Sequence, residues 1–252
     1  MNYKTEALVL HTVRYGDSRI IVDMFTRELG RQSYIVSVSK TGRSGMKKQY
    51  FQPLTLLLIE GDSRPLQQLQ RPRSAELLSP WQSLLTDPRK LAIALFVAEF
   101  LNYALRSEQK DEQLFDYVRA SLEWLDGRTD RYANFHLVFL MRLSRFLGFF
   151  PNLLPPAQGD LQSPHNPSQD FFFDLRAATF CAAPPLHHDF LMPEEAGRIR
   201  PLMRMDFATM HLFRLNRAER ARMLEIIERY YRLHLPAFPE LRSLPVLHEL
   251  FD

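Results

Sequence analysis

The stretch RIIVDMFTRELGRQSYIVSVS, residues 19–39, decides the fold of the first part of the chain. Within residues 19–26, Ile20, Val22 and Met24 would share one face of a strand, and apolar and polar residues alternate over residues 32–39. Alternation with a period of two is typical of strands that bury one face. The sequence ELG at residues 28–30 has the composition of a turn, so this stretch predicts a β-hairpin.

Further short apolar runs on both sides extend this pattern to five strands. Turn-forming sequences separate them, such as YGDS at residues 15–18 and GDS at residues 61–63. We expect strands over residues 7–13, 19–26, 32–39, 51–60 and 65–70. Five short strands at hairpin spacing favour a small barrel or sandwich.

From about residue 80 the apolar pattern takes a helical period. The pair Asp87-Pro88, and Asn216 with Glu219, have the spacing of helix N-termini. A run of strands followed by a run of helices predicts an α+β chain of two domains, residues 1–79 and 80–252. We expect helices over residues 88–106, 111–125, 130–147, 193–205, 216–235 and 241–251, and a short strand pair within residues 171–180.

The composition is that of an ordinary globular protein. The chain has 252 residues, of which 46% are hydrophobic and 24% charged. A single cysteine, Cys181, allows no internal disulfide and favours a reducing compartment. The N-terminus lacks the pattern of a secretory signal, and the most apolar stretch, residues 91–105, contains Glu99 and is too short for a bilayer. We therefore expect a cytoplasmic protein that does not contact membranes.

Charge is distributed unevenly along the chain. Residues 1–80 contain 12 Lys and Arg against 7 Asp and Glu, a net charge of +5, whereas the remaining residues have a net charge of -2. This asymmetry predicts that the first domain is attracted to polyanions. A basic, solubilising surface is the alternative interpretation.

No catalytic constellation is recognisable in the sequence. Nucleophile-elbow, phosphate-loop and dinucleotide motifs are all missing, so we expect neither an enzyme nor a bound cofactor. Cys181, His187, His188 and Asp189 carry metal-ligand atoms, but adjacent histidines in an extended segment point to opposite faces. We expect no metal, with solvated histidines and a structural thiol instead.

The strongest candidate site is basic. Lys40, Arg43, Lys47 and Lys48 lie within nine residues that contain no acid, and Tyr50 and Phe51 follow directly. Cations beside aromatic rings are typical of single-strand binding on a small barrel. The alternative is a solvated loop from which Tyr50 and Phe51 enter the core. Four further cations near the first hairpins extend the candidate patch: Arg14, Arg19, Arg27 and Arg31.

The helix expected over residues 130–147 is apolar nearly all round, apart from Arg142 and Arg145 in its second half. Such a helix forms the core of a helical bundle or lines an apolar pocket. In the second case the two arginines suit a partner that ends in acidic and aromatic residues.

The chain resembles the bacterial RecO family of recombination mediators. The resemblance rests on motifs that occur in the family's order, from an apolar strand and two turns to a basic loop and a C-terminal signature. The motifs are KTEALVL at residues 4–10, YGDS at 15–18, FTRELG at 25–30, KTGRS at 40–44, FQPL at 51–54, YYxxH at 230–234 and LRSL at 241–244.

This resemblance implies a specific fold and function. The N-terminal domain would be a five-stranded OB-fold barrel and the C-terminal domain mostly α-helical. The protein would bind single- and double-stranded DNA at the nucleoid and anneal complementary strands. With RecR it would help to load RecA onto DNA coated by single-strand-binding protein, whose C-terminal tail it would contact. A protein-binding adaptor without direct DNA contact is the alternative.

The sequence departs from the family at one place. Many members carry a four-cysteine zinc module between the helices, and the equivalent region here is near residues 170–190, where Cys181 is the single cysteine. We expect a degenerate module without zinc, held by other interactions.

Overall fold

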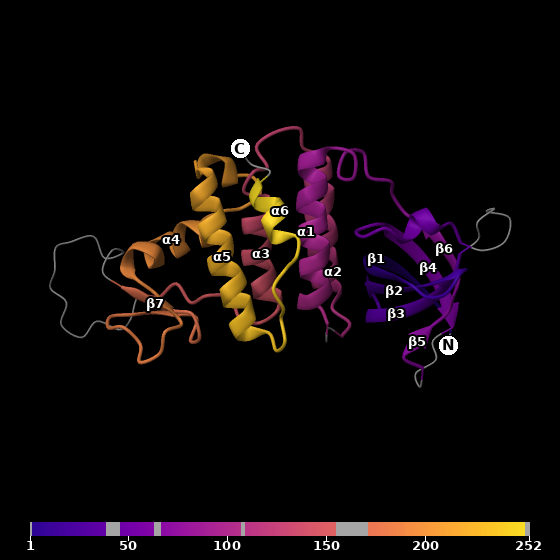
Figure 1. Cartoon of the computed structure of the whole chain (residues 1–252), viewed down its shortest axis with the longest axis horizontal. Helices are drawn as coiled ribbons and strands as arrows, with labels where there is room; N and C mark the ends of the chain where they lie inside the picture. The colour runs from indigo at the N-terminus through magenta and orange to yellow at the C-terminus, as the bar shows by residue number, and fades with distance from the viewer. Residues whose placement is uncertain (1, 39–45, 63–66, 107–108, 155–170, 250–252) are drawn as a thin grey trace. The chain divides into compact units, whose positions relative to one another are not determined.

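The computed structural model describes residues 2–38, 46–62, 67–106, 109–154 and 171–249 (Figure 1). These residues form two compact units. The first unit comprises Met1–Arg128 together with Glu240–Asp252, and the second unit comprises Thr129–Pro239. Each unit has its own buried hydrophobic residues.

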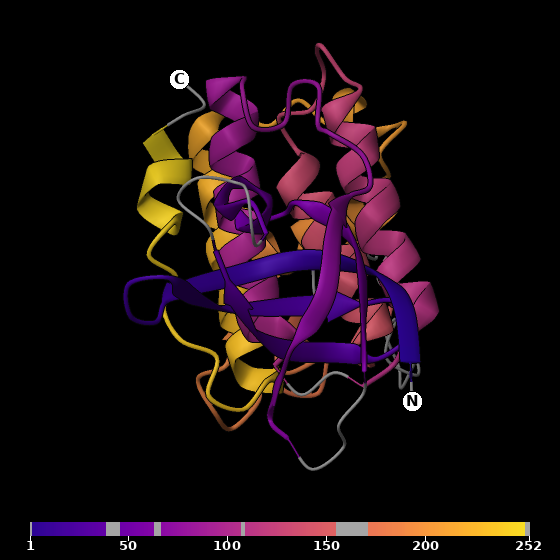
Figure 2. The ribbon, with the colours of Figure 1, turned by 90° about the vertical axis from the view of Figure 1, so that its right-hand side faces the viewer.

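A six-stranded sheet forms the β part of the first unit. Its elements are β1 (Asn2–Arg14), β2 (Arg19–Thr26), β3 (Gly30–Ser37), the 3₁₀ turn η1 (Lys48–Phe51), β4 (Leu56–Asp62), β5 (Leu69–Gln70) and β6 (Pro72–Leu77). The strand order is β5-β3-β2-β1-β4-β6, so β5 and β6 are at opposite edges. Since Arg71 alone separates them in the chain, the two edges come together and the sheet curls around a common interior (Figure 2).

The hairpin predicted over residues 19–39 is confirmed. β2 and β3 pair antiparallel from Arg19 opposite Ser37 to Thr26 opposite Gly30. Ile20, Val22 and Met24 point into the barrel interior as expected. Gly30 has a φ of 68°, a conformation that glycine adopts without steric cost, and its carbonyl accepts a hydrogen bond of 2.8 Å from the Thr26 hydroxyl.

Three strand predictions are wrong in extent. The first strand, expected from residue 7, begins at Asn2. The strand expected from residue 51 begins only at Leu56, because the chain first makes η1 and then a left-handed turn at Leu54, where φ is 61°. The Leu54 backbone is held by hydrogen bonds to Val9 and from the Trp81 indole, and these contacts are remote in sequence. The last strand, expected to end at residue 70, continues beyond Arg71 as β6.

Three helices complete the first unit: α1 (Pro88–Ala104), α2 (Glu112–Asp126) and α6 (Leu244–Glu249). The Asp87 side chain caps α1 as the sequence predicts, by accepting hydrogen bonds from the backbone N–H groups of Arg89 and Lys90. Glu99, the charge within the most apolar stretch, accepts hydrogen bonds from the backbone of Arg242 and Ser243. None of the described helices is both long and apolar enough to cross a membrane.

The second unit is mainly helical. It contains α3 (Phe135–Phe146), the small sheet of β7 (Phe172–Asp174), β8 (Thr179–Cys181) and β9 (Phe190–Leu191), α4 (Pro193–Arg204), the 3₁₀ turn η2 (Met210–Leu212) and α5 (Arg217–His234). The strand pair expected within residues 171–180 and the capping box of Asn216 with Glu219 are both confirmed. The α+β class is therefore also confirmed, with an OB-like sheet followed by a helical part.

Candidate nucleic-acid interface

One end of the β2–β3 hairpin brings two groups of predicted cations together. Arg19 pairs with Ser37 in the sheet, and the Ser37 carbonyl accepts a hydrogen bond from the Met46 backbone N–H. The neighbouring Val38 donates a hydrogen bond to the Ser18 carbonyl in the β1–β2 turn. The segment that leads to Lys47 and Lys48 and the turn that carries Arg14 and Arg19 therefore flank the same end of β3.

The four cations at this end are exposed to solvent. Among the described residues, Arg14 lies 3.7 Å from Asp17 and donates an exposed hydrogen bond of 3.2 Å to the Gly16 carbonyl. Arg19 and Lys47 lie over the rings of Tyr15 and Tyr50, at 5.8 Å and 5.6 Å from the ring centroids. Exposed side chains with such weak contacts can turn toward phosphates at little cost. The other two predicted cations of this segment, Lys40 and Arg43, lie outside the described residues.

Tyr50 and Phe51 take different positions. Phe51 is buried in the barrel interior, with 2% of its surface exposed, as the core interpretation expects. Tyr50 packs against the outside of this core and remains half-exposed in η1. One of the two aromatic rings is therefore accessible beside Lys47.

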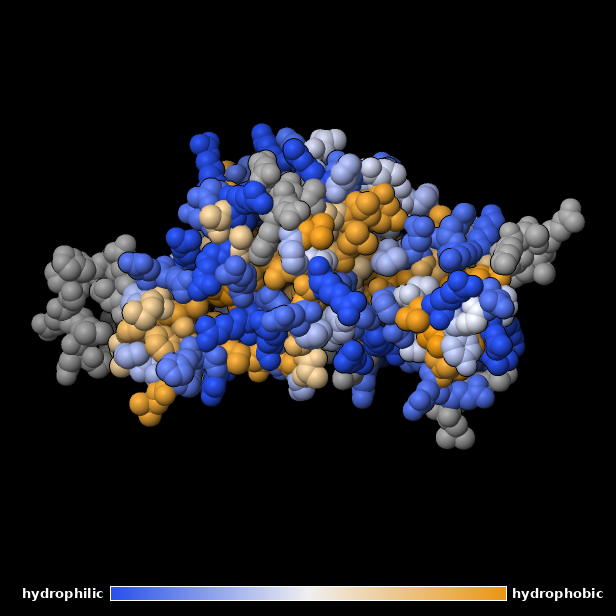
Figure 3. Space-filling view, in the orientation of Figure 1, coloured by the Kyte–Doolittle hydropathy of each residue, from blue (hydrophilic) through white to orange (hydrophobic). Residues whose placement is uncertain are grey.

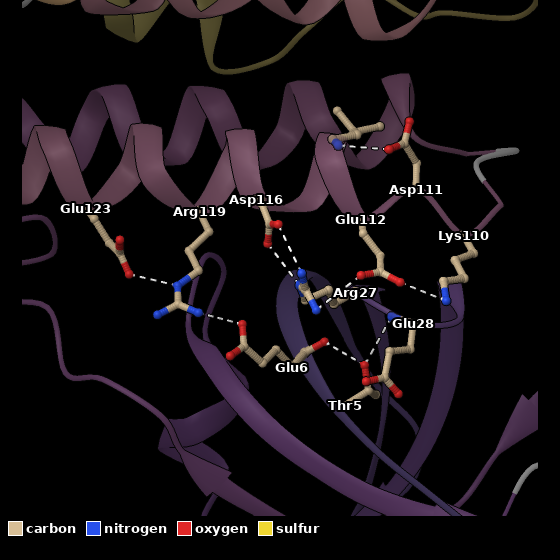
Figure 4. A network of polar contacts seen from close by, with 11 residues as sticks. Thr5, Glu6, Arg27, Glu28, Lys110, Asp111, Glu112, Asp116, Arg119 and Glu123 are labelled. Carbon is tan, nitrogen blue, oxygen red and sulfur yellow. Dashed lines mark hydrogen bonds and ion pairs between the residues drawn. The ribbon is translucent and has the colours of Figure 1, made fainter.

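Arg27 lies at the opposite end of the hairpin, about 25 Å along the strand from Arg19 at the rise of an extended chain. Its guanidinium makes two hydrogen bonds with the Asp116 carboxylate, at 2.9 and 3.1 Å, and an ion pair of 3.2 Å with Glu112 (Figure 4). The Asp116 hydrogen bonds raise the pKa of Arg27, and those from Arg27 lower the pKa of Asp116. Arg119 makes a similar link from α2 to Glu6 of β1, at 2.6 Å.

Arg31 is also bound within the first unit. Its guanidinium donates to the Asn102 carbonyl at 2.6 Å, to the Asn102 side-chain oxygen at 2.9 Å and to Asp23 at 3.1 Å. Burial is the main influence on this group and lowers the pKa of Arg31. Arg27 thus joins the sheet to α2, and Arg31 joins it to α1. Both guanidinium groups are already paired with carboxylate or carbonyl oxygens.

A cavity of about 530 Å³, which was not predicted from the sequence, opens beside the exposed cations. The end of β3, the segment from Met46 to Tyr50 and the start of β6 form its walls, with Arg71 and Arg73 among its lining residues. The sequence RPR at residues 71–73 indicates that Arg71 and Arg73 share a face, since residues two apart in an extended chain lie on the same side. The strand predicted from the sequence ends at residue 70, so it does not include Arg71 and Arg73, which line the cavity.

Arg142 and Arg145 lie in the second unit. α3 is buried along most of its length and packs with α5 and α4, which agrees with its interpretation as a bundle core. Both arginines are exposed, and the Arg145 guanidinium lies 4.4 Å from the centroid of the Phe150 ring. The pKa of Asp206 is lowered mainly by hydrogen bonds from Thr209, and the charge of Arg142 makes a smaller contribution.

The small sheet contains the candidate metal ligands but does not bring them together. The Cys181 thiol contacts the Phe172 carbonyl at 3.8 Å, His187 lies 3.3 Å from Asp174, and His188 is exposed. Across the part of the chain that the structure describes, no three His, Cys, Asp or Glu residues gather in a way that could hold a metal ion. These residues do not fit the four-cysteine zinc site of the family resemblance.

Aromatic packing and one carboxylate hold the small sheet together. The Phe173 and Phe180 rings pack edge to face at 5.0 Å, and the Arg200 guanidinium covers Phe180 at 4.8 Å. Asp189 accepts hydrogen bonds from Arg176 at 2.7 Å and from Arg229 of α5 at 2.8 Å. Figure 3 also shows hydrophobic surface over this part of the second unit, where Leu186 and Met192 are exposed.

Two family models match the chain. The N-terminal model of recombination protein O matches residues 1–81, and the C-terminal model of the same protein matches residues 85–245. The chain is also 49% identical over 253 residues to the DNA repair protein RecO of Bacteroides fragilis, with 100% of both chains covered. The chain belongs to the RecO family.

Further relatives agree with this assignment. The DNA repair protein RecO of Phocaeicola vulgatus is 49% identical over 252 residues with 100% of both chains covered, and that of Porphyromonas gingivalis is 36% identical over 250 residues with 98% of both covered. RecO membership supports a role in DNA repair and recombination. The two RecO models divide the chain between residues 81 and 85, whereas α1 and α2 belong to the same compact unit as the sheet.

Proposed function

We propose that this RecO-family chain is a non-catalytic recombination mediator that binds single- and double-stranded DNA and anneals complementary strands. The observation that carries the proposal is the full-length match to DNA repair proteins of this family. The exposed cations at one end of the β2–β3 hairpin support it, because phosphates attract cations whatever the base sequence.

The contacts within the DNA-binding surface follow from this proposal. Lys40, Arg43, Lys47 and Lys48 bind phosphates, and Arg14 and Arg19 extend the surface along the first hairpin. Arg27 and Arg31 contribute less than the sequence predicts, because DNA has to compete with their carboxylate and carbonyl partners.

Annealing without a nucleotide cofactor tests the proposed function. The full chain, mixed with two complementary oligonucleotides in the absence of ATP, should form duplex faster than the oligonucleotides do alone. A filter-binding assay on the same strands separates the alternative. Annealing at the protein-free rate together with no retained DNA would contradict the proposal and favour an adaptor that binds protein only.

The protein partners are a second part of the proposal. With RecR, the chain would help to load RecA onto DNA coated by single-strand-binding protein, and it would contact the C-terminal tail of the coating protein. Arg142 and Arg145, both exposed on α3, are the proposed contacts, since charge-assisted hydrogen bonds between arginine and carboxylate are stronger than those between neutral groups. The apolar residues of α3 that the sequence offered as a pocket are largely buried in the second unit.

A peptide with the sequence of that acidic tail tests this contact. The full-length Arg142→Glu/Arg145→Glu variant should bind the peptide at least tenfold more weakly than wild type, because two attractions become repulsions. Arg198→Glu/Arg204→Glu is the matched control, since both residues are exposed on α4 of the same unit. Equal loss in the two variants would indicate a general charge effect and remove Arg142 and Arg145 from the proposed site.

A further inference from the structure

The cavity in the first unit combines apolar and cationic walls. Ile35, Met46, Pro72 and Ala75 contribute apolar surface, and Tyr50 contributes an aromatic ring. Its volume of about 530 Å³ falls within the range of about 300–1,000 Å³ that is typical of sites for small ligands. The cavity is therefore large enough for a flat group the size of a nucleotide.

The charges on the lining favour an anionic ligand. Lys47, Arg71 and Arg73 oppose Glu76, the acid among the described lining residues. Arg73 forms an ion pair of 2.6 Å with Asp62, whereas Arg71 forms no ion pair within the described residues. Two of the three cations are thus available to a phosphate at the cavity mouth.

The cations and the ring are arranged as one nucleotide of a single strand requires. The Lys47 ammonium lies 5.6 Å from the centroid of the Tyr50 ring, so a phosphate and its base could contact neighbouring residues. Single-strand binding proteins combine a cationic groove for the backbone with aromatic rings on which bases stack. A duplex keeps its bases stacked on each other and cannot offer one to the ring.

We infer that this cavity is a subsite for one unstacked nucleotide of single-stranded DNA, with the base on Tyr50 and the adjoining phosphate between Lys47 and Arg71. The inference rests on the proposed DNA binding and adds to it a contact that distinguishes single strands from duplex. The basic surface binds both kinds of DNA through phosphates, whereas the Tyr50 subsite contributes only to the single strand.

Paired variants and paired strands test the subsite. Tyr50→Leu keeps an apolar side chain against the barrel core and removes the aromatic ring. Since one base on an aromatic ring contributes about 1–3 kcal/mol, this variant should bind a labelled oligothymidylate roughly tenfold more weakly than wild type. Tyr50→Phe should restore the affinity, and duplex binding should be the same for all three proteins. The measurement is fluorescence anisotropy at one fixed salt concentration.

A strand of the same length with abasic sugars at every position isolates the base contact. Wild type and Tyr50→Leu should bind this strand equally, because the strand has no base that could stack on the Tyr50 ring. Tyr103→Leu is the matched control, since this half-exposed tyrosine of α1 also has a cation, Arg106, over its ring at 5.2 Å and lies outside the cavity. It should leave every affinity unchanged.

The outcomes separate the subsite from the proposed function. Equal binding of the oligothymidylate by wild type and Tyr50→Leu, or an equal loss on the abasic strand, would overturn the subsite while DNA binding stands. No binding of any strand by wild type would overturn both. Thermal unfolding of each variant shows whether a loss of affinity comes from a loss of folded protein.

Discussion

Arginines at the two ends of the β2–β3 hairpin have different electrostatic surroundings. Arg19 is exposed at one end, whereas 13% of the Arg31 side chain is exposed at the other, where it binds Asp23 and Asn102. The sequence predicts that both lie on the hairpin but not what each contacts. Asn102 belongs to α1, 71 residues away from Arg31, and a side-chain partner that distant leaves no local pattern.

Arg31→Ala should therefore reduce stability rather than DNA binding. Its removal leaves the Asn102 carbonyl without this donor and leaves the Asp23 carboxylate with the Ser33 hydroxyl in a partly buried site, at a cost of roughly 2–3 kcal/mol. Urea unfolding gives the free energy of unfolding, and anisotropy over a salt series gives the DNA affinity and its slope.

Arg19→Ala is the matched control at the exposed end. It should change the free energy of unfolding by less than about 0.5 kcal/mol. It should also reduce the slope of log K against log salt by about 0.7, the value for one phosphate contact on a single strand. The opposite pattern, with Arg31→Ala weakening DNA binding at unchanged stability, would place Arg31 among the DNA contacts as the sequence suggests.

Local signals predict several elements of this fold well. Asp87 before Pro88 and Asn216 with Glu219 mark helix starts because a capping side chain acts within one turn of the helix. The β2–β3 hairpin follows from alternation and a turn in the same stretch. The turn at Leu54 could not be predicted, since contacts with Val9 and Trp81 hold it and leucine has no preference for positive φ.

An Asp189→Asn substitution should weaken the ion pairs within the small sheet and between this sheet and α5, and thereby destabilise this module. The Asp189 carboxylate binds Arg176 and Arg229, and its backbone carbonyl accepts a hydrogen bond from Leu175. Loss of the charge should lower the free energy of unfolding by roughly 1–2 kcal/mol and speed hydrogen exchange at the Leu175 amide. Asp130→Asn, which removes an exposed carboxylate 3.6 Å from Arg131 in the same unit, is the control and should have little effect.

The stability of the small-sheet module can also be tested by lowering the pH and by adding a chelator. Hydrogen bonds from Arg229 and Arg176 lower the pKa of Asp189 below its usual 3.8, so its contribution is present at neutral pH and is lost as the pH falls below about 4. EDTA should leave the unfolding of the wild-type chain unchanged. A lower stability after chelation would contradict this account and return Cys181, His187 and His188 to consideration as ligands.

On the scale of the whole molecule, positive charge is concentrated in residues 1–80, as the sequence indicates. The excess of cations in residues 1–80 is a property of composition and needs no structure to be seen. Its arrangement does need structure, because the pairing of Arg19 with Ser37 and the Met46 hydrogen bond decide which cations lie at the same end of the sheet. Tyr50 remains accessible while Phe51 enters the core, and adjacent aromatic residues give no sequence signal for this difference.

The salt dependence of single-strand binding tests the central claim most directly. For a variant in which Lys40, Arg43, Lys47 and Lys48 are all alanine, four lost phosphate contacts should flatten the slope of log K against log salt by about 3 and weaken binding at low salt by an order of magnitude or more. A variant that replaces four exposed arginines of the second unit, Arg131, Arg198, Arg204 and Arg232, should keep the wild-type slope. If the first variant instead has the slope of wild type, the basic segment is not the main DNA contact and the account is wrong.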